Sequence, residues 1–194
     1  MRMFLGALLI LCLVQTPYAR AQSQGSPDKS LAARTEYIPI ETLTLSDQQF
    51  LTGDKGEKPV TVAGQMRLVH GSKQSPLVIL VHGSGGVATN NEMWERWFNQ
   101  MGVSTFALDG FTGRGLTSLQ ADQSQLGRLN MIVDVYRSLA VLAKHPGIDP
   151  KRIALMGFSR RTNYALRERE ALPEALERFG HRDRGVHSCL RAVL

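Results

Sequence analysis

The chain has 194 residues and a net charge of +6, from 23 Lys and Arg against 17 Asp and Glu. This length is enough for one domain with a sizeable core. Most of the excess positive charge lies outside the nearly neutral segment 22–159, because the last 35 residues hold eight Arg and five acidic residues. No expected helix or strand of that segment gathers Lys and Arg on one face, which argues against a nucleic-acid-binding protein.

The first 21 residues have the layout of a secretory signal peptide. A basic start precedes an unbroken apolar run at 4–14, and small residues surround the expected cleavage site after Ala21. The run is too short to span a membrane, so we expect a periplasmic or secreted protein without a stable membrane anchor. A buried N-terminal strand or helix is the alternative. Cleavage would leave Cys189 as the only cysteine, which excludes an intramolecular disulfide.

The next segment predicts a flexible lead-in followed by a β-hairpin. Residues 22–35 are polar and turn-rich, as flexible lead-ins are. Residues 37–45 and 60–69 alternate apolar and polar side chains, which predicts two antiparallel strands. Pro39 suits an edge position for the first of them.

The pattern then changes to buried strands that alternate with amphipathic helices. Residues 77–81, 103–108 and 152–158 are apolar runs, typical of strands covered on both faces. Residues 91–101 and 126–143 have apolar side chains at helical spacing. In the first helix these are Met93, Trp94, Trp97, Phe98 and Met101. We therefore expect a doubly wound, mostly parallel α/β sheet with right-handed crossovers, preceded by the hairpin.

Three loops follow the carboxyl ends of these strands, where open α/β sheets bind ligands. The first, 82–86, reads HGSGG. Backbone N–H groups of this glycine loop are candidate oxyanion donors for acyl transfer. A phosphate-binding loop is the alternative, but the sequence lacks the GxxxxGK[ST] pattern. We expect His82 to support the turn rather than to act as a base.

The second loop, 109–115, carries one acid and one arginine. We expect Arg114 to lie exposed on a flexible surface loop. Asp109, at the strand end, either orients a neighbouring loop or caps a turn, and the sequence leaves both roles open.

The third loop begins with Gly157-Phe158-Ser159, after a buried strand and before an expected helix, which is the setting of a nucleophile elbow. Ser159 is the candidate nucleophile, and the N–H of Arg160 is a further candidate oxyanion donor. The second glycine of the pattern would stand at position 161, where this chain has Arg. A helix N-cap serine is the alternative.

Residues 76–160 resemble the N-terminal part of the dienelactone hydrolase-like branch of the α/β-hydrolases. The segments PLVILVHGSGG and FALDGFTGRG and the strand ending at Ser159 carry the resemblance. It implies an incomplete α/β-hydrolase fold over 36–160 and hydrolysis of a small-molecule ester or lactone through an acyl-enzyme, without a cofactor. By the same resemblance, Ser159 would be the nucleophile, and Gly83 or Ser84, together with Arg160, would supply the oxyanion N–H groups. Dienelactone hydrolases proper carry Cys at that position, which puts their own substrate in doubt here. The five His residues show no metal-ligand spacing.

The Arg-rich tail, 161–194, departs from this pattern. The family places an acid and then a His after the nucleophile, and the tail shows no convincing strand. Asp183 and His187 have the right order, but lie too close together to be more than weak triad partners. We expect an impaired hydrolase, with strand 152–158 at an exposed sheet edge, and a frame shift or recombined end near Arg160. The alternatives are a non-catalytic α/β fragment and a basic surface binder acting through the tail.

Overall fold

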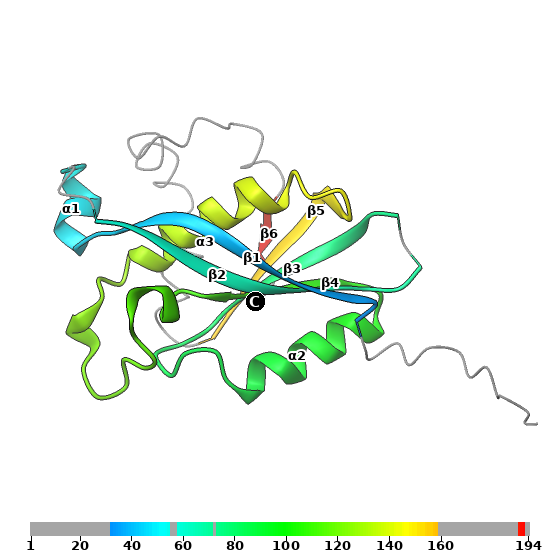
Figure 1. Cartoon of the computed structure of the whole chain (residues 1–194), viewed down its shortest axis with the longest axis horizontal. Helices are drawn as coiled ribbons and strands as arrows, with labels where there is room; N and C mark the ends of the chain where they lie inside the picture. Colours follow the sequence, from blue (N-terminus) through cyan, green and yellow to red (C-terminus); the bar gives the residue numbers. More distant parts are fainter. Residues whose placement is uncertain (1–31, 55–57, 72, 159–189, 193–194) are drawn as a thin grey trace, which may run out of the picture.

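The computed structural model describes residues 32–54, 58–71, 73–158 and 190–192. In this part of the chain, six strands form one sheet in the order β1-β2-β4-β3-β5-β6 (Figure 1). The strands are β1 (Arg34–Thr44), β2 (Lys58–Leu68), β3 (Ser75–Val81), β4 (Ser104–Asp109), β5 (Ile148–Gly157) and β6 (Leu190–Ala192). The helices are α1 (Asp47–Thr52), α2 (Thr89–Gln100) and α3 (Asn130–Leu142), with short 3-10 helices η1 (Thr112–Arg114) and η2 (Gln123–Gln125). None of the described helices is long and apolar enough to cross a membrane.

The predicted N-terminal hairpin is confirmed. β1 and β2 pair antiparallel from Arg34↔Leu68 to Thr44↔Lys58, and β2 also runs antiparallel to β4. The connection contains α1, which the sequence analysis did not anticipate. Ser46 caps this helix: its Oγ accepts from the N–H of Gln49 at 3.1 Å, and the Gln49 side chain accepts from the N–H of Ser46 at 2.8 Å. This reciprocal pair is a capping box.

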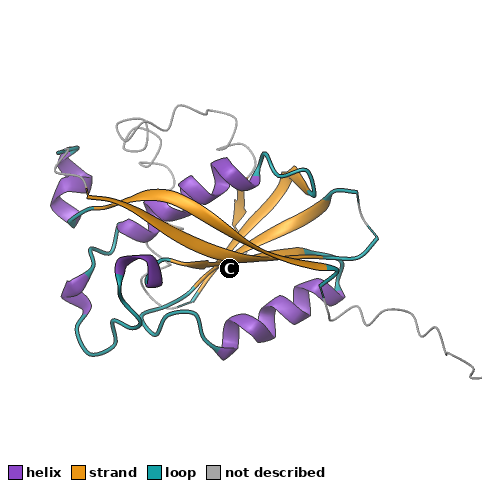
Figure 2. Ribbon diagram, viewed as in Figure 1, coloured by secondary structure: helices purple, strands orange, loops and turns teal. Residues whose placement is uncertain are grey.

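The predicted doubly wound arrangement is also confirmed. β3 pairs parallel with both β4 and β5. The chain crosses from β3 to β4 through α2, and then back past β3 to β5 through α3. Right-handed crossovers in opposite directions place their helices on opposite faces of the sheet, and Figure 2 shows α2 and α3 on its two sides. The architecture is therefore an α/β sheet with an antiparallel pair at one edge.

The apolar core lies between the sheet and α3. It includes fully buried side chains from the strands and from α3, such as Phe106, Ile132 and Leu139. The predicted helix at 126–143 begins only at Asn130, whose side chain accepts from the N–H of Leu45 at 2.8 Å and donates to its carbonyl at 2.6 Å. This pairing holds the start of α3 against the end of β1 and keeps the preceding residues in a loop.

The opposite face of the sheet is covered by α2, and the contact is polar. α2 turns Asn91, Glu95 and Asn99 inward, each at most 3% exposed, and Arg67 of β2 forms an ion pair with Glu95 at 3.0 Å. The two side-chain polar atoms of Asn91 and the Oδ1 of Asn99 are buried without a hydrogen-bond partner. The apolar stripe that predicts this helix is left largely in solvent. Its members Met93, Trp97 and Met101 are 52%, 59% and 59% exposed.

The strand edge at β5 differs from the prediction in one respect. Leu190–Ala192 forms β6 and pairs parallel with residues 153–155, so the expectation of no strand in the tail and of an uncovered β5 edge is wrong for these residues. A segment of three residues is too short to show the alternation that predicts a strand. It becomes a strand because the backbone groups at the edge of β5 supply hydrogen-bond partners. Asp149 and Pro150 lie inside β5, where the pairing with β3 is interrupted.

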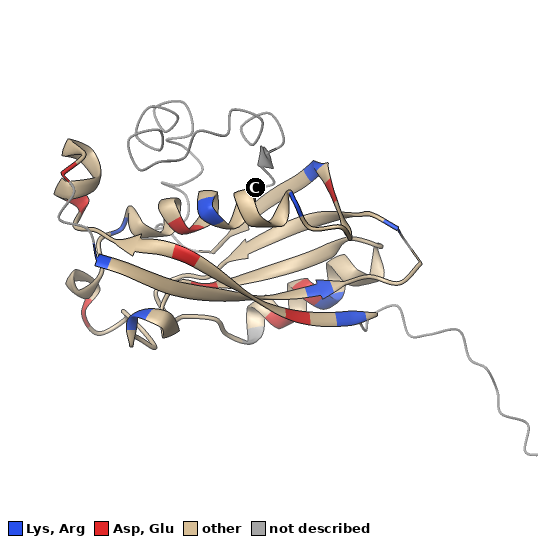
Figure 3. Ribbon diagram, turned by 45° about the horizontal axis from the view of Figure 1, so that its top comes forward, with Lys and Arg blue, Asp and Glu red and all other residues tan. Residues whose placement is uncertain are grey.

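Charged residues of both signs are interspersed along the described elements. Figure 3 shows both blue and red segments on the β1–β2 ribbon, whereas α1 carries only the acidic Asp47. The absence of a nucleic-acid partner stays a prediction.

Candidate active site

The three predicted loops lie side by side at one end of the sheet. In the parallel register, Val81 of β3 stands opposite Leu108 of β4 and Gly157 of β5. The N–H of Phe158 donates to the carbonyl of Val81 at 3.0 Å, which continues the pairing to the last described residue before position 159. The chain therefore leaves β5 beside the loop that follows β3.

The glycine loop after β3 is a tight turn with a fixed backbone. The N–H of Gly86 donates to the carbonyl of Gly83 at 3.1 Å, and the carbonyl of Ser84 accepts from the N–H of Leu119 at 2.7 Å. Gly86 has φ +78°, and a Cβ there would lie 2.6 Å from the carbonyl oxygen of Thr117. Within the described residues, the N–H groups of Gly83 and Ser84 donate to no other group. The described hydrogen bonds therefore leave these two N–H groups without an acceptor.

His82 supports this loop, as predicted. The N–H of Gly110 donates to its Nε2 at 3.2 Å, so the neutral ring carries its proton on Nδ1, which donates to the carbonyl of Gly83 at 2.7 Å. The ring also contacts Phe111 edge to face at 4.3 Å. Burial lowers the pKa of His82, and the Gly83 carbonyl and the carboxylate of Asp109 offset this shift only in part. With both nitrogens engaged, His82 has no free lone pair to accept a proton from a nucleophile.

Asp109 caps the turn after β4, which decides between its two predicted roles. Its carboxylate accepts from the N–H groups of Phe111 and Thr112 at 2.9 and 3.0 Å and from the Thr112 hydroxyl at 2.5 Å. Burial by itself raises the pKa of Asp109, but these hydrogen bonds outweigh it and hold the pKa below its ordinary value. The carboxylate is therefore committed to the loop.

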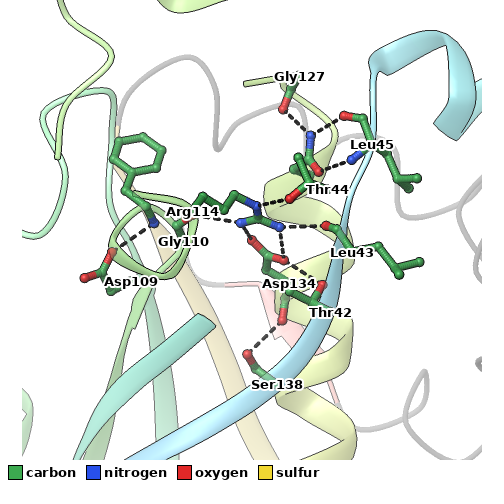
Figure 4. A network of polar contacts seen from close by, with 12 residues as sticks. Thr42, Leu43, Thr44, Leu45, Asp109, Gly110, Arg114, Gly127, Asp134 and Ser138 are labelled. Atoms are coloured by element: carbon green, nitrogen blue, oxygen red, sulfur yellow. Dashed lines mark hydrogen bonds and ion pairs between the residues drawn. The ribbon is translucent and has the colours of Figure 1, made fainter. Parts of the chain in front are cut away.

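Arg114 is not on an exposed loop, and that expectation is wrong. Its side chain is 3% exposed and forms an ion pair with the fully buried Asp134 of α3, with N–O distances of 2.6 and 2.9 Å (Figure 4). Burial raises the pKa of Asp134, and the hydrogen bonds from Arg114 and Thr42 oppose that shift. The one sequence signal was Asp134 itself, the single acid in the helix NMIVDVYRSLAVL. Its partner lies 20 residues away, so no local pattern joins the two.

A cavity of about 810 Å³ opens beside this site, between α2 and the β1–β2 ribbon. Tyr37 and Arg67 line one end, and Asp109 and Val87, from the loops after β4 and β3, line the other. Its lining thus includes residues of the segments that follow β3 and β4.

Four predicted site residues lie outside the described residues: Ser159, Arg160, Asp183 and His187. The geometry here therefore concerns the loops that surround position 159. Among the described residues, no three His, Cys, Asp or Glu side chains are grouped to hold a metal ion.

Comparison with known proteins identifies the fold. A dienelactone hydrolase-like promiscuous phosphotriesterase, P91, from metagenomic libraries has a similar structure, with a TM-score of 0.51 and 16% identity over 72% of this chain. An esterase from Pyrobaculum calidifontis matches with a TM-score of 0.50 and 18% identity over 76% of this chain. The chain has an α/β-hydrolase fold. It spans 56% and 42% of the length of these two proteins, so the described α/β-hydrolase fold is a partial one.

Sequence-level comparison adds nothing to this structural likeness. No protein-family model matches the chain, and no curated protein matches it. The expected relation to the α/β-hydrolases, and the expectation of an incomplete α/β-hydrolase fold, thus rest on the similarity of structures.

Proposed function

We propose that this chain carries the nucleophile and oxyanion half of a serine hydrolase that acts on small esters or lactones, with Ser159 as nucleophile. The observation that carries the proposal is the hydrogen bond from Phe158 N–H to Val81. It ends β5 beside Gly83 and Ser84, whose N–H groups are unengaged in the described part of the chain. An acyl-transfer site needs a nucleophile close to backbone N–H donors, and loops that follow two adjacent strands can supply both.

The proposal includes impaired catalysis, because the described residues offer no base. His82 has both ring nitrogens engaged. His145 pairs with Glu36 at 3.2 Å and precedes β5, and the exposed His70 follows β2, so both lie at the opposite end of the sheet. Asp183 and His187 are the candidates that remain for acid and base. Without a base, Ser is a weak nucleophile, and an oxyanion site alone gives roughly 10³–10⁴-fold acceleration over water.

The likeness to a phosphotriesterase and an esterase supports hydrolytic chemistry on small molecules for the same site. We also propose export, since the first 21 residues are a predicted signal peptide. N-terminal sequencing of protein recovered outside the cytoplasm should start at Gln22, and a start at Met1 in all fractions contradicts export.

A chromogenic short-chain ester and a fluorophosphonate probe test the proposed activity. The full mature chain should hydrolyse the ester slowly and should be labelled covalently by the probe, and Ser159→Ala should abolish both signals. Ser124→Ala is the matched control, because it removes an exposed hydroxyl outside the three candidate loops. Equal hydrolysis and equal labelling in the chain and in Ser159→Ala reject the enzyme.

The second candidate function is a non-catalytic α/β-hydrolase fragment that binds a small molecule or is inert. The engaged nitrogens of His82 favour it, because a supported loop without a base is sufficient for binding. The same pair of assays separates the two candidates: a fragment that only binds gives no Ser159-dependent label.

A further inference from the structure

The guanidinium of Arg114 is buried, yet every one of its donors has an acceptor. Arg carries five N–H donors, and five hydrogen bonds are formed. Nε donates to the Thr44 hydroxyl at 3.0 Å, Nη1 donates to the Gly110 carbonyl and to Asp134 at 2.7 and 2.6 Å, and Nη2 donates to the Leu43 carbonyl and to Asp134 at 2.7 and 2.9 Å. Figure 4 shows the side chain reaching from the loop after β4 to both β1 and α3. One residue thus joins three separate segments.

The contacts continue from Arg114 to the glycine loop. Gly110 uses both of its backbone polar groups: its carbonyl accepts from Arg114, and its N–H donates to Nε2 of His82 at 3.2 Å. His82 in turn donates from Nδ1 to Gly83 at 2.7 Å. These bonds, from Asp134 and Arg114 through Gly110 and His82 to Gly83, are called the Arg114 network below.

Gly110 packs closely against α3. A Cβ at Gly110 would lie 2.6 Å from the sulfur of Met131 and 3.2 Å from Oδ2 of Asp134. The backbone here therefore runs close to Asp134 and Met131 of α3, and the Gly110 peptide groups lie between the ion pair and His82.

We propose that Arg114 and Asp134 are positioning residues, which hold the N–H groups of Gly83 and Ser84 in place for an oxyanion through Gly110 and His82. This proposal rests on the proposed function, because the proposed function is what assigns the glycine loop an oxyanion role. The physical need is preorganisation: oxyanion donors stabilise a transition state most when they require no rearrangement as charge develops. A polar network whose members are all satisfied, in a low-dielectric interior, supplies that rigidity.

Stability alone is a poor account of the same pair. Replacing both members of a buried ion pair by apolar side chains of similar size is often neutral or stabilising. Arg114→Met combined with Asp134→Leu therefore keeps the packing between β1, α3 and the loop, and cuts the network at its source. Arg114→Lys is a second variant, which keeps the charge but has at most three donors in another geometry.

The test measures the far end of the network in the full chain. The ¹⁵N shifts of His82 report its tautomer, and amide hydrogen exchange reports the N–H groups of Gly86 and Gly110. In the wild type, His82 should be a single Nδ1–H tautomer and both amides should be protected. In the double variant, His82 should lose its single tautomer, and the protection of both amides should fall at least tenfold. Arg114→Lys should give the same change to a smaller extent. If the double variant does not fold, Arg114→Lys serves as the test of the proposal.

An unchanged tautomer and unchanged amide protection in a folded variant overturn the proposal, because a pair that only stabilises the fold leaves both where they were. Fluorophosphonate labelling of Ser159 gives the functional measurement and should slow at least tenfold in the double variant. If the wild-type chain is not labelled at all, the proposed function fails, while the tautomer and exchange results still decide whether Arg114 and Asp134 position the loop.

Discussion

Gly64→Ala should destabilise the protein, although exchanging Gly for Ala in a strand normally stabilises it. Gly64 lies in β2 opposite Leu108, and a side chain at this position would point into the core on the α3 side. A Cβ at this position would lie 2.1 Å from Cζ of Phe106 and 2.5 and 2.6 Å from the two Cε atoms. Since carbon atoms pack at about 3.5–4.0 Å, the ring would have to move by roughly 1.5 Å. Phe106 is fully buried, so it has no free volume to enter.

The two opposing contributions fix the sign and size of the effect. Overpacking of a well-packed core costs about 1–3 kcal/mol, whereas the loss of backbone freedom in the unfolded state returns about 0.4–1 kcal/mol. We expect a net loss of about 1–2 kcal/mol in the free energy of unfolding. With a urea m-value of about 2 kcal/mol/M, the midpoint followed by far-UV circular dichroism should fall by about 0.5–1 M.

Phe106→Leu is the matched second change, because it removes the ring atoms that the new methyl group meets. Alone it should destabilise by creating a cavity, but Gly64→Ala with Phe106→Leu should be more stable than the sum of the single effects predicts. A Gly64→Ala chain as stable as the wild type, or an additive double variant, refutes the packing of Phe106 against Gly64.

Arg114→Leu leaves Asp134 buried without its cation, so it should lower the free energy of unfolding by about 3–5 kcal/mol. The control is Arg152→Met, which removes an exposed ion pair of the same 2.6 Å length and should leave the urea midpoint nearly unchanged. Equal effects of the two changes contradict the argument from burial. Because burial lowers the pKa of His82 below the unfolded value of 6.5, the unfolded chain binds the extra proton, so stability should fall as the pH drops below about 6.5, by up to about 1.4 kcal/mol per pH unit. The His82→Gln variant should not show this loss of stability at low pH. Identical pH profiles for the variant and the wild type would exclude His82 as its cause. Ser46→Ala should cost about 1 kcal/mol by removing the cap of α1, with a smaller change in the urea midpoint than Arg114→Leu.

The loops of the candidate site were predictable because they follow from local pattern. Apolar runs at 77–81, 103–108 and 152–158 mark strands buried on both faces, and parallel strands bring the loops after them to one end of the sheet. The glycine loop and the supporting role of His82 follow in the same way. Even α1 had a local signal, because Ser46 and Gln49 form a capping box. This signal was missed because it lies directly after the alternating pattern of the first strand.

Features that depend on distant partners were not predictable. Arg114 is buried because β1, some 70 residues earlier, and α3, 20 residues later, supply acceptors for it, and neither is visible in the sequence of its own loop. β6 has three residues, and pairing with β5 rather than composition makes it a strand. The outward stripe on α2 arises because β2 and β4 offer polar side chains such as Arg67 and Thr105 to that helix. Its spacing predicted a helix, but spacing cannot say which face meets the sheet.

The orientation of α2 also determines what the protein's fluorescence reports. The chain has two tryptophans, Trp94 and Trp97, and both belong to this helix. Trp97 is 59% exposed, so a neutral quencher reaches it in the folded state. Tryptophan emission therefore follows the docking of α2 on the sheet, while far-UV circular dichroism follows the sheet and α3. A difference between the two unfolding curves measures how far α2 detaches before the apolar core opens.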